Sequence, residues 1–136
     1  MISPVHARTM AAYNRWMNER LYELCAALPD AERKRDRGAF FRSVHGTLNH
    51  LLYGDRAWMS RFTARDLGWR GPADELYADF AELRAARAGL DHLIENWAAR
   101  LDESWLAAVN RGTPIVDMIR TDSRMRDALG AQAPRH

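Results

Sequence analysis

Apolar side chains recur every three or four positions along the first 28 residues, which is the period of an amphipathic helix. The positions that form this stripe, two of them polar, are Val5, Thr9, Tyr13, Trp16, Arg20, Leu24 and Leu28, with Met17 and Leu21 beside them. Ser3 and Pro4 precede the stripe as a capping residue and a first helical residue, and Pro29 ends it. The pattern predicts a helix from Ser3 to Pro29, followed by a polar connection over residues 29–41.

A second helix is predicted from Ser43 to Arg65, and a third over residues 76–101. The apolar face expected of the second helix consists of Val44, Leu48, Leu51, Asp55, Trp58 and Phe62. In the third helix, the steps between apolar positions alternate between four and three: Leu76, Phe80, Leu83, Arg87, Leu90, Ile94, Trp97 and Leu101. Arg87 interrupts this seam, and we expect its guanidinium to point outward or at a carboxylate. A heptad seam of this kind is typical of a helix in a bundle.

The pattern weakens after Ser104. Thr113 and Pro114 could start a fourth helix, whose apolar face would consist of Ile115, Met118, Ile119, Met125 and Leu129. No strand alternation, glycine-rich phosphate loop or internal repeat is present in the sequence. The fold class predicted is therefore all-α, a four-helix bundle whose last helix is short or incomplete.

Composition fits one globular domain spanning residues 1–136. The apolar share is 47% and the charged share 28%, which is typical of a soluble protein and not of a disordered one. No apolar run reaches the roughly 18 residues of a membrane span, and the first residues lack the pattern of a signal peptide. We therefore expect a cytoplasmic protein without a membrane partner. The single cysteine, Cys25, excludes an intrachain disulfide and is expected to be buried.

The charge pattern argues against a nucleic-acid partner. The formal net charge is only +2. The densest basic cluster, residues 32–42, is interrupted by acidic side chains, whereas a nucleic-acid site needs a basic face with few opposing charges. A solvated loop is the better interpretation of this cluster.

Two histidines lie on the helix predicted over residues 43–65. At about 100° per residue, His45 and His50 are separated by roughly 140° around the helix axis, too far to bind one metal as a pair. His45 falls at the edge of the apolar face. His50 lies on a stripe of small and aromatic residues and is expected to meet a neighbouring helix or a second subunit.

Asp55 is unusual because its position lies in the middle of the predicted apolar face. A buried carboxylate is costly unless it is hydrogen-bonded or paired. The interpretation favoured by this position is a hydrogen bond between helices, with candidate partners on the first helix at Asn14, Arg15, Asn18 and Arg20.

Two stretches resemble the DinB-like family, the damage-inducible, metal-binding helical bundles. They are YNRWMNERLYELCAALP (13–29) and FFRSVHGTLNHLLYGDRAWMSRF (40–62). The second is the specific one, with a serine that opens the helix, then NHLL, then GDRAW and an arginine–phenylalanine pair. The resemblance covers residues 5–105, whereas residues 106–136 diverge.

This resemblance implies an up-down-down-up four-helix bundle, usually a homodimer, that holds one divalent metal ion, commonly nickel or zinc. In the family three histidines bind the metal, and His50 matches the one on the second helix. Relatives include transferases and isomerases that use low-molecular-weight thiols, in which the metal would activate a thiolate.

The chain departs from the family at the other two ligands. The family carries them as H-x-x-x-H on its last long helix, but no such pair follows Trp105, and the only histidine beyond His92 is His136. Either the end of the gene is truncated or frame-altered, or this member has lost its site. His92 and Asp55 are further candidates for completing the site, although a zinc site needs at least three protein ligands around one point.

Two hypotheses about function follow. One is a metal-dependent hydrolase or thiol transferase with an incomplete site, served by a small-molecule thiol. The alternative is a non-catalytic bundle that dimerises or binds a small apolar ligand between its helices.

Overall fold

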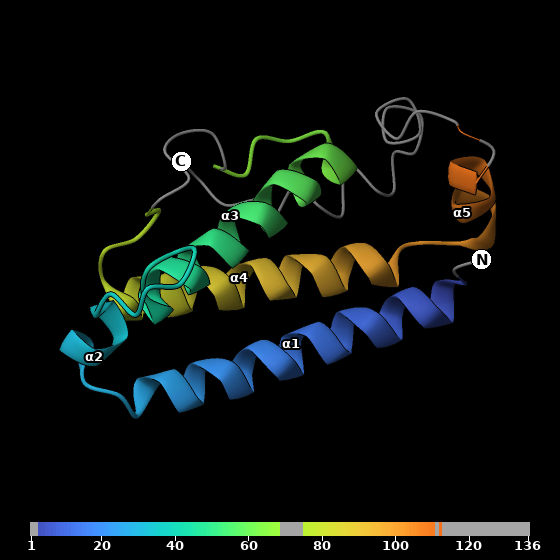
Figure 1. The fold of residues 1–136 in the computed structure, drawn as a ribbon. Helices are drawn as coiled ribbons and strands as arrows, with labels where there is room; N and C mark the ends of the chain where they lie inside the picture. The colour runs from blue at the N-terminus through green and yellow to red at the C-terminus, as the bar shows by residue number, and fades with distance from the viewer. Residues whose placement is uncertain (1–2, 69–74, 111, 113–136) are drawn as a thin grey trace.

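The structure, a computed structural model, describes residues 3–68, 75–110 and 112. Five helices occur in this part of the chain (Figure 1): α1 (Pro4–Ala26), α2 (Asp30–Lys34), α3 (Val44–Thr63), α4 (Phe80–Ala99) and α5 (Glu103–Asn110). No strand occurs among these residues beyond one isolated bridge between Ala39 and Arg42. The all-α class predicted from the sequence is confirmed. No described helix is both long enough and apolar enough to cross a membrane.

The three long helices follow the first three directions of an up-down-down-up bundle. In Figure 1, α1 runs antiparallel to α4, whereas α3 starts at the same end of the molecule as α4. Contacts agree with these directions: Tyr22 of α1 stacks on Phe80 at the start of α4, and Phe62 at the end of α3 stacks on Trp97. The fourth helix predicted from Thr113 lies outside the described residues.

Capping side chains explain where α1 and α3 begin. The hydroxyl of Ser3 accepts a hydrogen bond from the backbone N–H of His6 at 3.1 Å, and Ser43 accepts one from Gly46 at 2.9 Å. Each bond satisfies an N–H that has no partner inside its helix. α3 ends at Ala64, whose φ of 55° lies in the left-handed region. The sequence predicted both helices to within a few residues.

The other boundaries differ from the predictions. Residues 30–34 form α2 inside the expected polar connection, and α5 forms where the apolar pattern weakens. The third helix was expected to start at Leu76 but starts at Phe80, because the N–H groups of Leu76 and Tyr77 both donate to the side-chain oxygen of Asn49 at 2.9 Å. This tertiary contact replaces the first turn that the heptad pattern predicts.

The buried face of α1 is not the apolar stripe that the sequence indicates. The side chains that face α4 are smaller or more polar: Ala7, Ala11, Asn14, Asn18, Tyr22 and Cys25. The expected stripe is exposed instead, including Tyr13, Trp16 and Leu24. The prediction was wrong because Asn14 and Asn18 find a buried partner on α4, which hydropathy alone does not reveal.

The face of α3 is also rotated from its predicted position. Leu48 is buried as expected, but Leu51 is exposed and Trp58 is 57% exposed. The buried side chains are those one position further along: His45, Asn49, Leu52, Arg56 and Met59. His45, expected at the edge of this face, is buried and its Nε2 donates to the carbonyl oxygen of Tyr77 at 2.8 Å. Polar residues that bind the segment before α4 therefore set the rotation of the helix.

The core lies where α1, α3 and α4 meet. Its most deeply buried apolar side chains are Leu52, Leu67, Leu83 and Leu93. Cys25 belongs to this core, as predicted, and burial raises the pKa of its thiol despite the opposing charge of Arg33. A thiol held in its neutral form is a poor nucleophile, so Cys25 is a packing residue.

Gly46 provides a test of this architecture, because a Cβ atom there would collide with the carbonyl oxygen of Phe41. Gly54, in the same helix, has no atom within 4 Å of the corresponding position. We expect Gly46→Ala to lower the free energy of unfolding by about 1–3 kcal/mol through overpacking. Gly54→Ala should raise it by about 0.5–1 kcal/mol through helix propensity. Urea denaturation of both variants checks this, and equal stability of the two would contradict the close approach of the loop to α3.

Candidate functional site

His50, the residue that matches a family metal ligand, lies half-buried on α3 against the preceding loop. Its ring stacks on that of Phe41, with centroids 3.8 Å apart and planes 19° from parallel, and Tyr53 lies 6.1 Å away. The stripe around His50 was expected to meet a helix or a second subunit. Within the chain, the ring packs on an aromatic side chain of the loop over residues 35–43 and not on a helix, whereas contact with a second subunit stays a prediction.

The other two candidate ligands lie in different surroundings. His92 is exposed on α4. Asp55 is 43% exposed, and its Oδ2 lies 2.7 Å from Nη2 of Arg87. Its partner is thus an arginine of α4 and not one of the α1 residues expected from the sequence. Among the described residues, no three histidine, cysteine, aspartate or glutamate side chains form a group that could hold a metal ion.

The strongest polar cluster is centred on Asp91, a fully buried residue of α4. Its carboxylate accepts hydrogen bonds from Nε and Nη2 of Arg87 at 3.0 and 2.7 Å. Asn14 and Asn18 of α1 donate to the same carboxylate at 3.1 Å. Asp55 of α3 contacts the same Nη2 atom of Arg87, so this cluster joins all three long helices. Arg87 was expected to point outward or at a carboxylate, and it binds the carboxylate of Asp91.

Charge balance makes this cluster stable in spite of its burial. Burial alone would lower the pKa of the Arg87 guanidinium, but the negative charges of Asp91 and Asp55 outweigh it, and the pKa lies above its ordinary value. A buried charge of this kind is tolerated when it is both paired and hydrogen-bonded. The sequence analysis missed Asp91, although its i,i+4 spacing from Arg87 on a predicted helix is a signal for such a pair.

An apolar cavity of about 530 Å³ lies between α1, α3 and α4 and reaches α5. The described residues that line it are His6, Ala7, Met10, Ala11, Asn14, Asp55, Trp58, Met59, Phe62, Ile94, Trp97, Ala98, Leu101 and Leu106. Most of these side chains are apolar, and the polar ones are His6 and two members of the Arg87–Asp91 cluster, Asn14 and Asp55.

Aromatic rings dominate one wall of this cavity. Phe62 stacks between Trp58 and Trp97, with centroid distances of 6.0 and 5.3 Å. The indole nitrogen of Trp97 is buried and has no hydrogen-bond partner in the part of the chain that the structure describes. An indole N–H can only donate, so the hydrogen-bonding capacity of this buried nitrogen is unused among the described residues.

Comparison with protein families gives one result. The model of the DinB family matches residues 1–123. The chain belongs to the DinB family. A comparison with curated proteins and another with solved structures found no match.

DinB-family proteins are often metal-binding. His50 supplies one candidate nitrogen, but its described neighbours are aromatic carbons, and Asp55 is bound to Arg87. A zinc site requires at least three protein ligands. The described residues of this DinB-family chain do not fit such a site.

The Arg87–Asp91 cluster leads to a stability prediction. Asp91→Asn leaves the buried Arg87 without its main counter-charge and should lower the free energy of unfolding by about 3–5 kcal/mol. Asp55→Asn is the matched control, because it changes the exposed partner of the same guanidinium and should cost about 0–1 kcal/mol. Urea denaturation compares the two variants. A loss for Asp91→Asn no greater than that for Asp55→Asn would show that the cluster does not organise the fold.

Proposed function

We propose that this DinB-family protein binds a small, mainly apolar molecule in the cavity between α1, α3 and α4. The observation that carries the proposal is the cavity itself, with its volume of about 530 Å³ and its mostly apolar and aromatic wall. Ligand sites in proteins have this size, an apolar lining and a few polar groups that orient the ligand.

The polar groups at the cavity define the ligand further. Trp97 lines the cavity, and its indole N–H, unpaired among residues 3–68, 75–110 and 112, can donate to an acceptor such as a carbonyl or hydroxyl oxygen. The half-exposed carboxylate of Asp55 can accept from a hydroxyl or amine. A ring or short chain with one oxygen substituent matches this arrangement.

2-Naphthol is a suitable probe, because it combines an aromatic body with one hydroxyl group. We expect it to shift the Trp97 indole N–H signal in ¹H–¹⁵N spectra and to bind about fivefold more weakly to Trp97→Phe, which loses one hydrogen-bond donor. Trp16→Phe is the matched control, since Trp16 is exposed on α1 and does not line the cavity. Unchanged Trp97 signals, or equal weakening in both variants, would exclude the cavity as the binding site.

Metal-dependent hydrolysis or thiol transfer is the second candidate, and it rests on the DinB-family match and the position of His50 in the family motif. It requires ligands from outside the described residues or from a second copy of the chain. A low-molecular-weight thiol would then be the partner of the transferase.

Elemental mass spectrometry tests this second candidate on untagged protein purified without chelator. A functional site predicts about one nickel or zinc ion per chain, lost in His50→Ala because a ligand is removed. His92→Ala is the control, since His92 is an exposed histidine elsewhere in the bundle. Wild-type protein without metal, or metal retained in His50→Ala, would exclude a site at His50.

The homodimer implied by the family stays a prediction. It is supported by the row of large apolar side chains that α1 exposes, including Tyr13, Trp16 and Leu24, since exposed apolar patches of this kind mark interaction surfaces.

A further inference from the structure

The apolar cavity between α1, α3 and α4 has a carboxylate in its wall. Asp55 is the one aspartate, glutamate, lysine or arginine among the described residues that line it. Its side chain is 43% exposed, so the carboxylate is open to a molecule in the cavity. The other polar residues of the described lining are Asn14 and His6. A ligand therefore meets a carboxylate beside apolar walls, and it meets no lysine or arginine of the described chain.

The cluster behind Asp55 has an excess of negative charge. Nη2 of Arg87 lies 2.7 Å from a carboxylate oxygen of Asp55 and 2.7 Å from one of Asp91. One guanidinium is thus shared between two carboxylates, and the amides of Asn14 and Asn18, which also donate to Asp91, are uncharged. Since Asp91 is fully buried, a cation that balances the remaining charge has to approach Asp55 from the cavity.

Two other arginines on the helices around the cavity are engaged elsewhere. Nε of Arg15 on α1 lies 3.0 Å from a carboxylate oxygen of Glu95 on α4. The guanidinium of Arg61 on α3 lies over the ring of Trp58, 5.2 Å from its centroid. Neither arginine is among the residues that line the cavity. The excess charge at Asp55 is thus available to a ligand.

The aromatic wall of the cavity continues from Asp55 along α3. Trp58 and Phe62 follow Asp55 by three and seven residues, so the three side chains share one face of the helix. At 1.5 Å per residue, the two rings lie roughly 4.5 and 10.5 Å further along the helix axis. A molecule whose charged group lies at Asp55 can therefore extend its apolar part along these rings.

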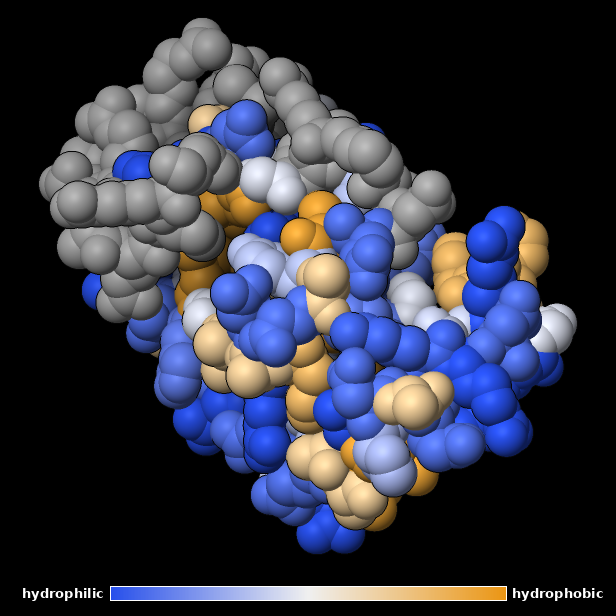
Figure 2. All heavy atoms as spheres, turned by 90° about the vertical axis from the view of Figure 1, so that its left-hand side faces the viewer, coloured by the Kyte–Doolittle hydropathy of each residue, from blue (hydrophilic) through white to orange (hydrophobic). Residues whose placement is uncertain are grey.

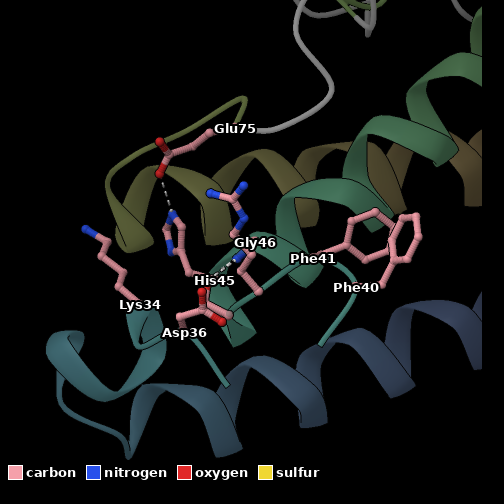
Figure 3. A pocket seen from close by; sticks show the side chains of 9 residues that line it. Lys34, Asp36, Phe40, Phe41, His45, Gly46 and Glu75 are labelled. Atoms are coloured by element: carbon pink, nitrogen blue, oxygen red, sulfur yellow. Dashed lines mark hydrogen bonds and ion pairs between the residues drawn. The ribbon is translucent and has the colours of Figure 1, made fainter. Parts of the chain in front are cut away.

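A second cavity, of about 650 Å³, differs in the charges that line it. It lies next to α2, at an end of the molecule where the surface is mostly hydrophilic with small hydrophobic patches (Figure 2). Asp36 and Glu75 lie near the ring of His45 in this cavity (Figure 3). Two cationic side chains, Lys34 and Arg42, belong to the same wall. Because both signs of charge are present, we expect this second cavity to discriminate little between cations and anions.

Two local features of the second cavity belong to the protein chain itself. Nδ1 of His45 has no hydrogen-bond partner within the described ranges, but it is buried and out of reach of a ligand. The φ of Arg42, 68°, lies in the left-handed region, which is rare for residues other than glycine. The turn that holds Arg42 there is closed by a backbone hydrogen bond from its N–H to the carbonyl oxygen of Ala39 at 2.9 Å.

We propose that the ligand of the apolar cavity is a small organic amine, whose ammonium group binds Asp55 and whose apolar part packs along Trp58 and Phe62. This inference rests on the proposed function, because it names the class of molecule that the same cavity takes. The ammonium group donates a charge-assisted hydrogen bond to the carboxylate of Asp55. It also balances the negative charge that Arg87 leaves uncompensated, whereas an anion of the same shape is repelled.

The first experiment compares three probes of one shape and different charge. 2-Naphthylmethylamine, 2-naphthalenemethanol and 2-naphthoate are titrated into the full chain, and the Trp97 indole N–H signal is followed in ¹H–¹⁵N spectra. We expect the amine to bind about tenfold more tightly than the alcohol, because a charge-assisted hydrogen bond is roughly twice as strong as a neutral one. The carboxylate should bind more weakly than the alcohol.

Two variants locate the charge that selects the amine. Asp55→Asn should weaken binding of the amine about tenfold and leave binding of the alcohol within about twofold. This variant keeps the ion pair between Arg87 and Asp91. Glu19→Gln is the matched control, since Glu19 is an exposed carboxylate of α1 that does not line the cavity, and it should bind both probes as the wild type does. An amine that binds Asp55→Asn as tightly as wild type would refute the inference.

The outcomes distinguish this inference from the proposed function. If the alcohol shifts the Trp97 signal and the amine binds no more tightly, the cavity is a ligand site that does not select a cation, and only the inference is overturned. If none of the three probes shifts Trp97, the proposed function fails and the inference fails with it. If the amine shifts the ring signals of His45 in ¹H–¹³C spectra and leaves Trp97 unchanged, it binds in the second cavity, which also overturns the inference.

Discussion

One buried carboxylate, that of Asp91, holds the described bundle together. Through Arg87 it is linked to α3, and through Asn14 and Asn18 it is linked to α1. A cluster of this kind imposes a register on α1 and α4, because moving either helix by one residue leaves a charge or an amide of the cluster without its partner. Apolar packing alone tolerates such shifts far better. The polar cluster thus determines which of several possible apolar arrangements is adopted.

This constraint explains which parts of the structure could be predicted from the sequence. The starts of α1 and α3 depend on a local signal, a serine hydroxyl that accepts a hydrogen bond from the backbone N–H three residues further along the chain. Both starts were predicted. The buried faces of the same helices depend on partners more than 25 residues away, such as Tyr77 for Asn49 and Asp91 for Asn18. Hydropathy assigns these amides to the surface, which is why both faces were predicted incorrectly.

The candidate sites, like the helices, could be predicted from the sequence only in part. His50 was identified from a motif, but the stacking of its ring on Phe41 results from the path of a loop that no periodicity describes. The sequence does not show that Nδ1 of His45 lacks a hydrogen-bond partner among the described residues, or that the backbone of Arg42 is strained. Each of these features results from contacts made on folding. Both cavities therefore became visible only once side chains distant in the sequence had been brought together.

The pairing of α1 with α4 also has a consequence for the order in which the protein forms. Asn14 and Asp91 are 77 residues apart in the chain, and at the usual rate of translation this distance takes about 4–15 s to synthesise. Until then α1 lacks the helix that buries its small and polar face. Neither side of α1 is then covered, and contacts of such long range also close slowly in the free chain. The nascent protein is therefore most exposed to aggregation before α4 has been translated.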